Sequence, residues 1–117
     1  LYSKVVREVI ADRVKDRKVV GHNIIDYDAP ILKRLLGIEI PHENLVDTLV
    51  MSRLFHFNIE GGHSLEAWGR RLNMPKTGKD ITDWSTLTLN MMTRCIQDTE
   101  INFALLNFLK ERLRIEL

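Results

Sequence analysis

The chain has 117 residues, 44% hydrophobic and 28% charged, and its 17 basic and 16 acidic residues leave a net charge of +1. These values are ordinary for one small globular domain, so we treat residues 1–117 as a single, partial domain. The near-neutral charge excludes nucleic-acid binding through bulk positive charge, so such binding must be local. No apolar run approaches the roughly 18 residues of a membrane helix, and we expect no membrane partner.

Cys95 is the only cysteine, which excludes an internal disulfide and favours a reducing, cytoplasmic setting. The chain starts at Leu1 without a methionine or a signal peptide. We therefore expect it to be a piece of a longer protein.

The first third of the chain predicts a helix, a strand and a second helix. Valines and isoleucines at helical spacing predict a helix over residues 3–17, with Ser3 as its N-cap. The β-branched run 18–22 predicts a short buried strand. Pro30 in a first turn and Gly37 as a stop delimit the second helix, which follows Asp28 directly.

The rest of the chain predicts mostly helix. Residues 45–46 can form a very short strand, and Asp47 is expected to cap the helix after it. A short helix is expected over residues 64–72. Residues 73–83 are polar, with a proline and a glycine, and predict a loop. From residue 86 onward an apolar stripe predicts one long helix to the end of the chain.

The predicted strand over residues 18–22 has too few strand neighbours in this sequence. One or two short strands do not make a stable sheet by themselves, and Val19-Val20 is too apolar for an exposed edge. The sequence therefore predicts that further strands come from an upstream segment or from another chain. Pairing with its own copy would give a homodimer through this exposed strand.

Two carboxylates stand in settings that suit metal chemistry. Asp28 follows a predicted strand at a helix start, and Asp98 lies on the long final helix, which can cross the strand ends. Together they can bind Mg²⁺ or Mn²⁺, and two such ions activate water for phosphodiester cleavage. The simpler interpretations are a helix N-cap for Asp28 and a solvated helix residue for Asp98.

Four blocks in order resemble DEDD-type 3′–5′ exonucleases, and are most similar to the proofreading domain of family A DNA polymerases from podovirus-type phages. They extend over nearly the whole chain, and together are far more specific than any one alone. The blocks are HNIIDYD (22–28), ENLVDTLVMSRL (43–54), GHSLEAWGRRL (62–72) and MMTRCIQD (91–98).

The resemblance implies an α/β, RNase H-like fold, truncated here, mostly helical with one or two short parallel strands. It implies removal of nucleotides from the 3′ end of single-stranded DNA by a two-metal site. Asp28 and Asp98 would be the catalytic metal ligands, and Asn23 would approach the primer terminus. His63 could line the substrate groove, although a turn role suits it equally. Asp47 would be structural.

The sequence departs from this family in two ways. The family's opening Asp-x-Glu motif, which lies on its first strand and supplies two of about four metal carboxylates, has no counterpart ahead of the helix over residues 3–17. The third motif normally reads Tyr-x-x-x-Asp, and here Arg94 holds the tyrosine's place. Arginine has no acceptor, so Arg94 could only pair with Asp98 or bind a substrate phosphate.

Three hypotheses follow from these observations. The first is the second part of a proofreading exonuclease, which needs the missing N-terminal segment or a polymerase partner and is inactive alone. The second is a catalytically dead, exonuclease-like module that binds nucleic acid or a protein. The third is the homodimer through the exposed strand.

Overall fold

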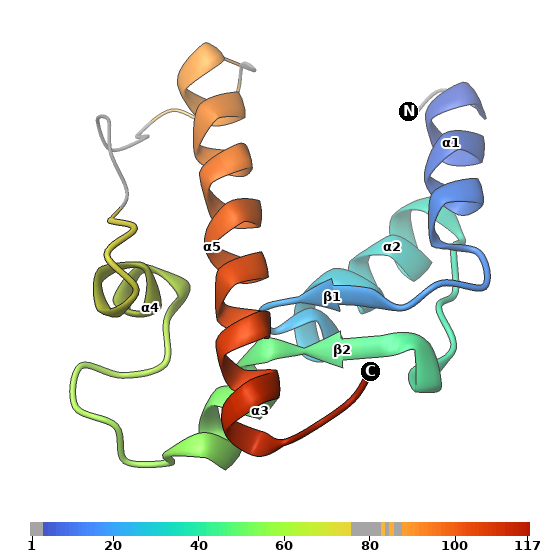
Figure 1. The fold of residues 1–117 in the computed structure, drawn as a ribbon. Coiled ribbons are helices and arrows are strands. Elements are labelled where there is room, and N and C mark those ends of the chain that lie inside the picture. The colour runs from blue at the N-terminus through green and yellow to red at the C-terminus, as the bar shows by residue number, and fades with distance from the viewer. Residues whose placement is uncertain (1–3, 76–82, 84, 86–87) are drawn as a thin grey trace. The chain divides into compact units, whose positions relative to one another are not determined.

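The computed structural model describes residues 4–75, 83, 85 and 88–117. The described residues group into two compact units, Leu1–Val50 and Met51–Leu117. The elements, shown in Figure 1, are α1 (Lys4–Val14), β1 (Val19–Gly21), the π-helical turn η1 (Ile24–Asp28), α2 (Ala29–Leu36), the 3₁₀ turn η2 (His42–Asn44), β2 (Leu45–Asp47), α3 (Thr48–Phe55), α4 (Leu65–Arg71) and α5 (Leu89–Leu113).

The first unit is built on two short parallel strands. β1 pairs with β2 in the register Val19 to Leu45, Val20 to Val46 and Gly21 to Asp47, and Figure 1 shows the two arrows side by side. The prediction of one or two short parallel strands in a mostly helical α/β chain is therefore confirmed. The buried apolar residues of this unit form a small core: Ile24, Ile38, Ile40 and Val46.

Helix α1 forms where the valine spacing predicts a helix, but it buries none of its residues. It ends at Val14, earlier than the predicted residue 17, and Asp16 takes a left-handed conformation with φ 54°. The predicted N-cap, Ser3, lies outside the described residues. The guanidinium Nε of Arg7 donates to the carbonyl of Leu36 at 2.7 Å, which ties α1 to the end of α2.

Helix α2 has the limits that its proline and glycine predict. Pro30 lies in the first turn, where a missing N–H costs nothing. Gly37 ends the helix with φ 64°, a conformation that glycine takes without a Cβ penalty, and its N–H donates to the Lys33 carbonyl.

The second unit has an aromatic core. The rings of Phe55, Trp68 and Phe108 contact one another in tilted and edge-to-face arrangements with centroids 5.6 to 6.1 Å apart, and Trp68 is 2% exposed. Aromatic contacts of this kind add to the free energy gained from burial. The buried face of α5 completes this core with Ile101, Leu105 and Leu109.

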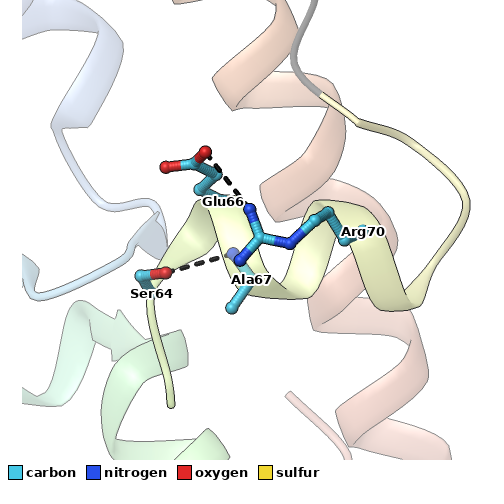
Figure 2. Close-up of polar contacts among 4 residues, drawn as sticks. All are labelled: Ser64, Glu66, Ala67 and Arg70. Atoms are coloured by element: carbon cyan, nitrogen blue, oxygen red, sulfur yellow. Dashed lines mark hydrogen bonds and ion pairs between the residues drawn. The ribbon is translucent and has the colours of Figure 1, made fainter. Parts of the chain in front are cut away.

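Helix α4 begins where residues 64–72 predict a helix. The Ser64 hydroxyl accepts from the Ala67 N–H at 3.0 Å, which makes Ser64 the N-cap. One turn into the helix, Glu66 pairs with Arg70 at 3.2 Å, as Figure 2 shows. Both side chains of that pair are mainly exposed, so the cap contributes more than the pair does.

Helix α5 is one continuous element capped by the Thr88 hydroxyl, which accepts from the Met91 N–H. It ends at Leu113, and Arg114 takes a left-handed conformation. The prediction of a helix to the end of the chain is therefore wrong for its last residues. Most of the predicted 73–83 loop lies outside the described residues. In the part of the chain that the structure describes, no helix is long and apolar enough to cross a membrane.

Candidate metal and nucleic-acid site

The segment between β1 and α2 holds the first candidate ligand. Asn23 takes a left-handed conformation with φ 68°, and its carbonyl accepts from the Tyr27 N–H at 3.0 Å. Residues Ile24–Asp28 then form a π-helical turn that leads directly into α2. Single π-helical turns are rare and often stand at functional sites. No simple residue pattern in the sequence indicates this conformation.

Asp47, at the end of β2, organises this turn. It is 6% exposed, and its Oδ1 accepts from the backbone N–H groups of Asn23 and Leu49, both at 2.9 Å. Its Oδ2 accepts from the Ile25 N–H at 3.2 Å. The predicted structural role in capping α3 is confirmed by the bond to Leu49, but the two bonds to the turn were not foreseen.

Asp28 ends the π-helical turn with an exposed side chain. It makes no side-chain cap hydrogen bond to α2, so the N-cap interpretation is wrong. Partial burial, and to a smaller extent the negative charge of Asp47, raise the pKa of the Asp28 carboxyl above its usual range. A bound cation would offset the repulsion between the charges of two neighbouring carboxylates. Carboxylate oxygens are donors that fit Mg²⁺ or Mn²⁺.

Asp98 and Arg94 lie in the second unit, on α5, and both side chains are half-buried. At four residues apart they share one face of the helix. Asp98 also opens an Asp-Thr-Glu triplet with Glu100. Residues two apart on a helix point to different sides, so this triplet does not give the paired carboxylates of the strand-borne family motif. The roles of Asp98 as a ligand and Arg94 as its neighbour stay predictions.

His22 follows β1 directly, and its Nδ1 shares a 2.9 Å hydrogen bond with the hydroxyl of buried Thr48. His22 is thus a hydrogen-bonded residue at the end of a strand. This bond joins the end of β1 to the start of α3.

His63 uses both ring nitrogens in the second unit. Its Nε2 lies 2.7 Å from the Phe57 carbonyl, so Nε2 carries the proton and donates. Its Nδ1 shares a 2.6 Å hydrogen bond with the Ser52 hydroxyl. The oxygen of that hydroxyl accepts from the Trp68 indole N–H at 2.8 Å. These contacts favour the turn role for His63 over the substrate-groove role, and Ser52 is a network member that the sequence did not indicate.

The basic residues of α4 and of the segment that follows it could in principle contact phosphates, but they have other partners or lie outside the described residues. Arg70 pairs with Glu66. Arg71 donates to the carbonyls of Glu60 and Gly62 and stacks on Trp68 at 4.8 Å. Lys76 and Lys79 lie outside the described residues.

No cluster of three or more His, Cys, Asp or Glu side chains that could hold a metal ion occurs within residues 4–75, 83, 85 and 88–117. Asp28 is an exposed carboxylate that is influenced electrostatically by Asp47, and by itself it is an incomplete donor set for a metal ion.

Comparison of this chain with known proteins found similarity to phage proteins. No family model matches it. It is 31% identical over 127 residues to the DNA-directed DNA polymerases of Escherichia phage T7 and of Enterobacteria phage T3. Each alignment covers 75% of this chain and 18% of the polymerase, so the chain spans less than a fifth of the length of these curated relatives. The chain is therefore related to one part of phage DNA polymerases.

Proposed function

We propose that this chain is the second part of a 3′–5′ exonuclease domain of a phage-type DNA polymerase, with an RNase H-like fold. The observation that carries the proposal is Asp28, an exposed carboxylate held on a π-helical turn beside the buried carboxylate of Asp47. The similarity to part of phage DNA polymerases supports DNA as the substrate class, and the choice of its 3′ end belongs to the proposal. The reaction would be hydrolysis of the 3′-terminal phosphodiester bond, as in proofreading.

Mg²⁺ or Mn²⁺ is the cofactor that this donor chemistry fits. Asp28 and Asp98 would hold the ions, which when bound supply Lewis acidity and an activated water. Asn23 would approach the terminal nucleotide, Arg94 would bind a phosphate, and His63 would shape the groove through its turn. Two carboxylates are fewer than a two-metal site needs, so we propose that the remaining ligands come from a segment outside these 117 residues.

A catalytically dead binding module is the second candidate. Its supporting observation is Arg94, which stands where the family motif has tyrosine and carries a permanent positive charge. A cation on the same helix face as Asp98 competes with a metal ion for that carboxylate. Such a module would bind single-stranded nucleic acid equally with and without divalent ions.

The test is a nuclease assay on DNA labelled at its 5′ end, with Mn²⁺ or with EDTA. Two proteins are compared: this chain, and a longer one in which an Asp-x-Glu strand segment precedes Leu1. We expect 3′ shortening only from the longer protein with Mn²⁺, and its loss in Asp28→Asn and Asp98→Ala. Asp26→Asn is the matched control, because Asp26 is an exposed acid in the same turn.

Each alternative outcome has a distinct meaning. Shortening by the 117-residue chain itself would show that its carboxylates, in one copy or two, suffice. An inactive longer protein that Arg94→Tyr activates would place the defect at the third motif. DNA binding that EDTA leaves unchanged, with no cleavage by either protein or by the Arg94→Tyr variant, would favour the dead module.

A further inference from the structure

We infer that Asp47 is a positioning residue, which shapes the turn that presents Asp28; the inference rests on the proposed function, in which Asp28 is a metal ligand. Asp47 lies in unit Leu1–Val50 together with every atom that the argument uses. Its own carboxylate is buried, so it acts through the turn rather than on a bound ion.

The hydrogen bonds of Asp47 divide into two groups. One bond, from the Leu49 N–H at 2.9 Å, is an ordinary helix cap on α3. The other two, from the N–H groups of Asn23 and Ile25, reach back across the sheet to the segment that begins the π-helical turn. A residue needed only to cap α3 would require only the bond from the Leu49 N–H.

The shape of the turn explains why those two bonds matter. Asn23 holds a left-handed conformation, which most residues with a Cβ atom avoid and which asparagine tolerates best among them. A π-helical turn also has a weaker backbone pattern than the α-helix that follows it. The carboxylate of Asp47 holds the Asn23 and Ile25 N–H groups together, and bonds to a charged acceptor are among the strongest available. Without it, the turn can relax toward an α-helical path, which rotates Asp28 to another face.

The chemistry of Asn at position 47 separates positioning from capping. An amide has the same shape as a carboxylate but only one acceptor oxygen. In Asp47→Asn that oxygen can stay at the Oδ1 position and keep the bonds from Leu49 and Asn23. The NH₂ group then faces the Ile25 N–H, donor against donor, so the bond from Ile25 is the one lost. The cap on α3 remains.

Thr48→Val provides the matched control at the next residue. Thr48 is fully buried, and its hydroxyl bonds with His22 Nδ1 and donates to the Gly21 carbonyl at 3.5 Å. Valine keeps the volume and removes those hydrogen bonds at the same junction of β2 and α3. It leaves the bonds of Asp47 to the turn in place.

The experiment uses amide NMR on the 117-residue chain and two readouts. The first is hydrogen exchange of the Ile25 amide, expected to rise roughly tenfold in Asp47→Asn and to stay unchanged in Thr48→Val. The second is broadening of the amides of residues 24–28 by Mn²⁺. This broadening is expected to disappear in Asp28→Asn and to need a several-fold higher Mn²⁺ concentration in Asp47→Asn. Thermal melting checks that the two junction variants lose similar stability.

The outcomes separate the two claims. Equal Mn²⁺ broadening in Asp47→Asn and the unchanged protein would overturn the positioning role and leave the proposed function standing. Broadening that does not depend on Asp28 would overturn the proposed metal site. In that case, unchanged Ile25 exchange in Asp47→Asn would also overturn the control of the turn by Asp47. If Thr48→Val mimics Asp47→Asn in both readouts, the effect is general loosening and the inference fails.

Discussion

Different kinds of contact stabilise the interior of each of the two units of this chain. The unit Met51–Leu117 has an aromatic cluster, buried leucines and isoleucine on α5, and a side-chain network around Ser52. The unit Leu1–Val50 has a small apolar core, a helix without a fully buried residue, and a buried carboxylate that accepts from three backbone N–H groups. Apolar burial thus dominates in the second unit, and polar positioning in the first.

The difference teaches that Asp28, the proposed metal ligand, lies in the unit whose described core is aliphatic and small. Hydrophobic burial is non-directional and stabilises many arrangements of similar volume, whereas a carboxylate that accepts from chosen N–H groups selects one backbone path. A site that needs one carboxylate at one place is better served by the second kind of contact. The following changes break or sharpen this comparison, from the largest expected effect to the smallest.

Trp68→Ala should have the largest effect, because it removes a side chain that is 2% exposed and contacts two phenylalanine rings, which also contact each other. It also removes the indole N–H that Ser52 accepts. We expect a loss of about 3–5 kcal/mol in the free energy of unfolding. Hydrogen exchange by residue should show α5 exposed while β1 keeps its protection. Equal loss of protection in both units would show that they unfold as one.

Gly69→Ala should destabilise the second unit by about 1–3 kcal/mol. An added Cβ would lie 2.7 Å from the Met74 carbonyl oxygen and 3.1 Å from Ile101 Cδ1, and a backbone oxygen cannot move aside easily. Urea denaturation followed by fluorescence measures the loss. Arg70→Ala on the same helix is the control, with a change of about 0.5 kcal/mol or less, because its ion pair is exposed. A Gly69→Ala change no larger than the control would contradict the close packing of α4.

Gly37→Ala tests the first unit through its backbone and should cost about 1 kcal/mol. The residue has φ 64°, and the nearest atom to an added Cβ is 3.9 Å away, so conformation rather than crowding is the cause. Gly37→Asn should cost less, since asparagine tolerates this conformation better. Thermal melting of the two variants gives the comparison. Equal losses of stability in Gly37→Ala and Gly37→Asn would contradict the left-handed conformation as the cause.

Val9→Ser should have the smallest effect, within about 0.5 kcal/mol, because Val9 is 52% exposed on α1. Urea denaturation at two protein concentrations measures it, with Leu105→Ala as a buried contrast that loses about 2–5 kcal/mol. A loss above 2 kcal/mol for Val9→Ser, dependent on concentration, would show that α1 is covered by another copy of the chain and that the first unit is less exposed than described.

Local sequence signals predicted the elements well because their causes are local. Pro30 and Gly37 delimit α2 through their own backbone preferences, and Ser64 caps α4 through its own hydroxyl. Val19 and Val20 are β-branched, and they form β1 together with Gly21. Ends without such residues were predicted less well: α1 stops three residues early, and α5 ends at Leu113 before the chain does.

The candidate site was predictable only in part. Asp28 was singled out from the sequence, but the structure had to exclude its role as an N-cap. The π-helical turn and the bonds from Asn23 and Ile25 to Asp47 join residues more than twenty positions apart, and periodicity carries no information on such pairs. The same holds for Ser52, whose partners His63 and Trp68 meet it only in the folded unit.

The sequence by itself determined the alternation of helices and short strands, the caps and stops, and the positions of the carboxylates, because these depend on each residue and its near neighbours. Only the tertiary structure decided which carboxylate is exposed and which is buried as an organiser. Asp28 and Asp47 are alike as amino acids, and their roles differ because parallel pairing of β1 with β2 places the Asn23 and Ile25 N–H groups within reach of one of them.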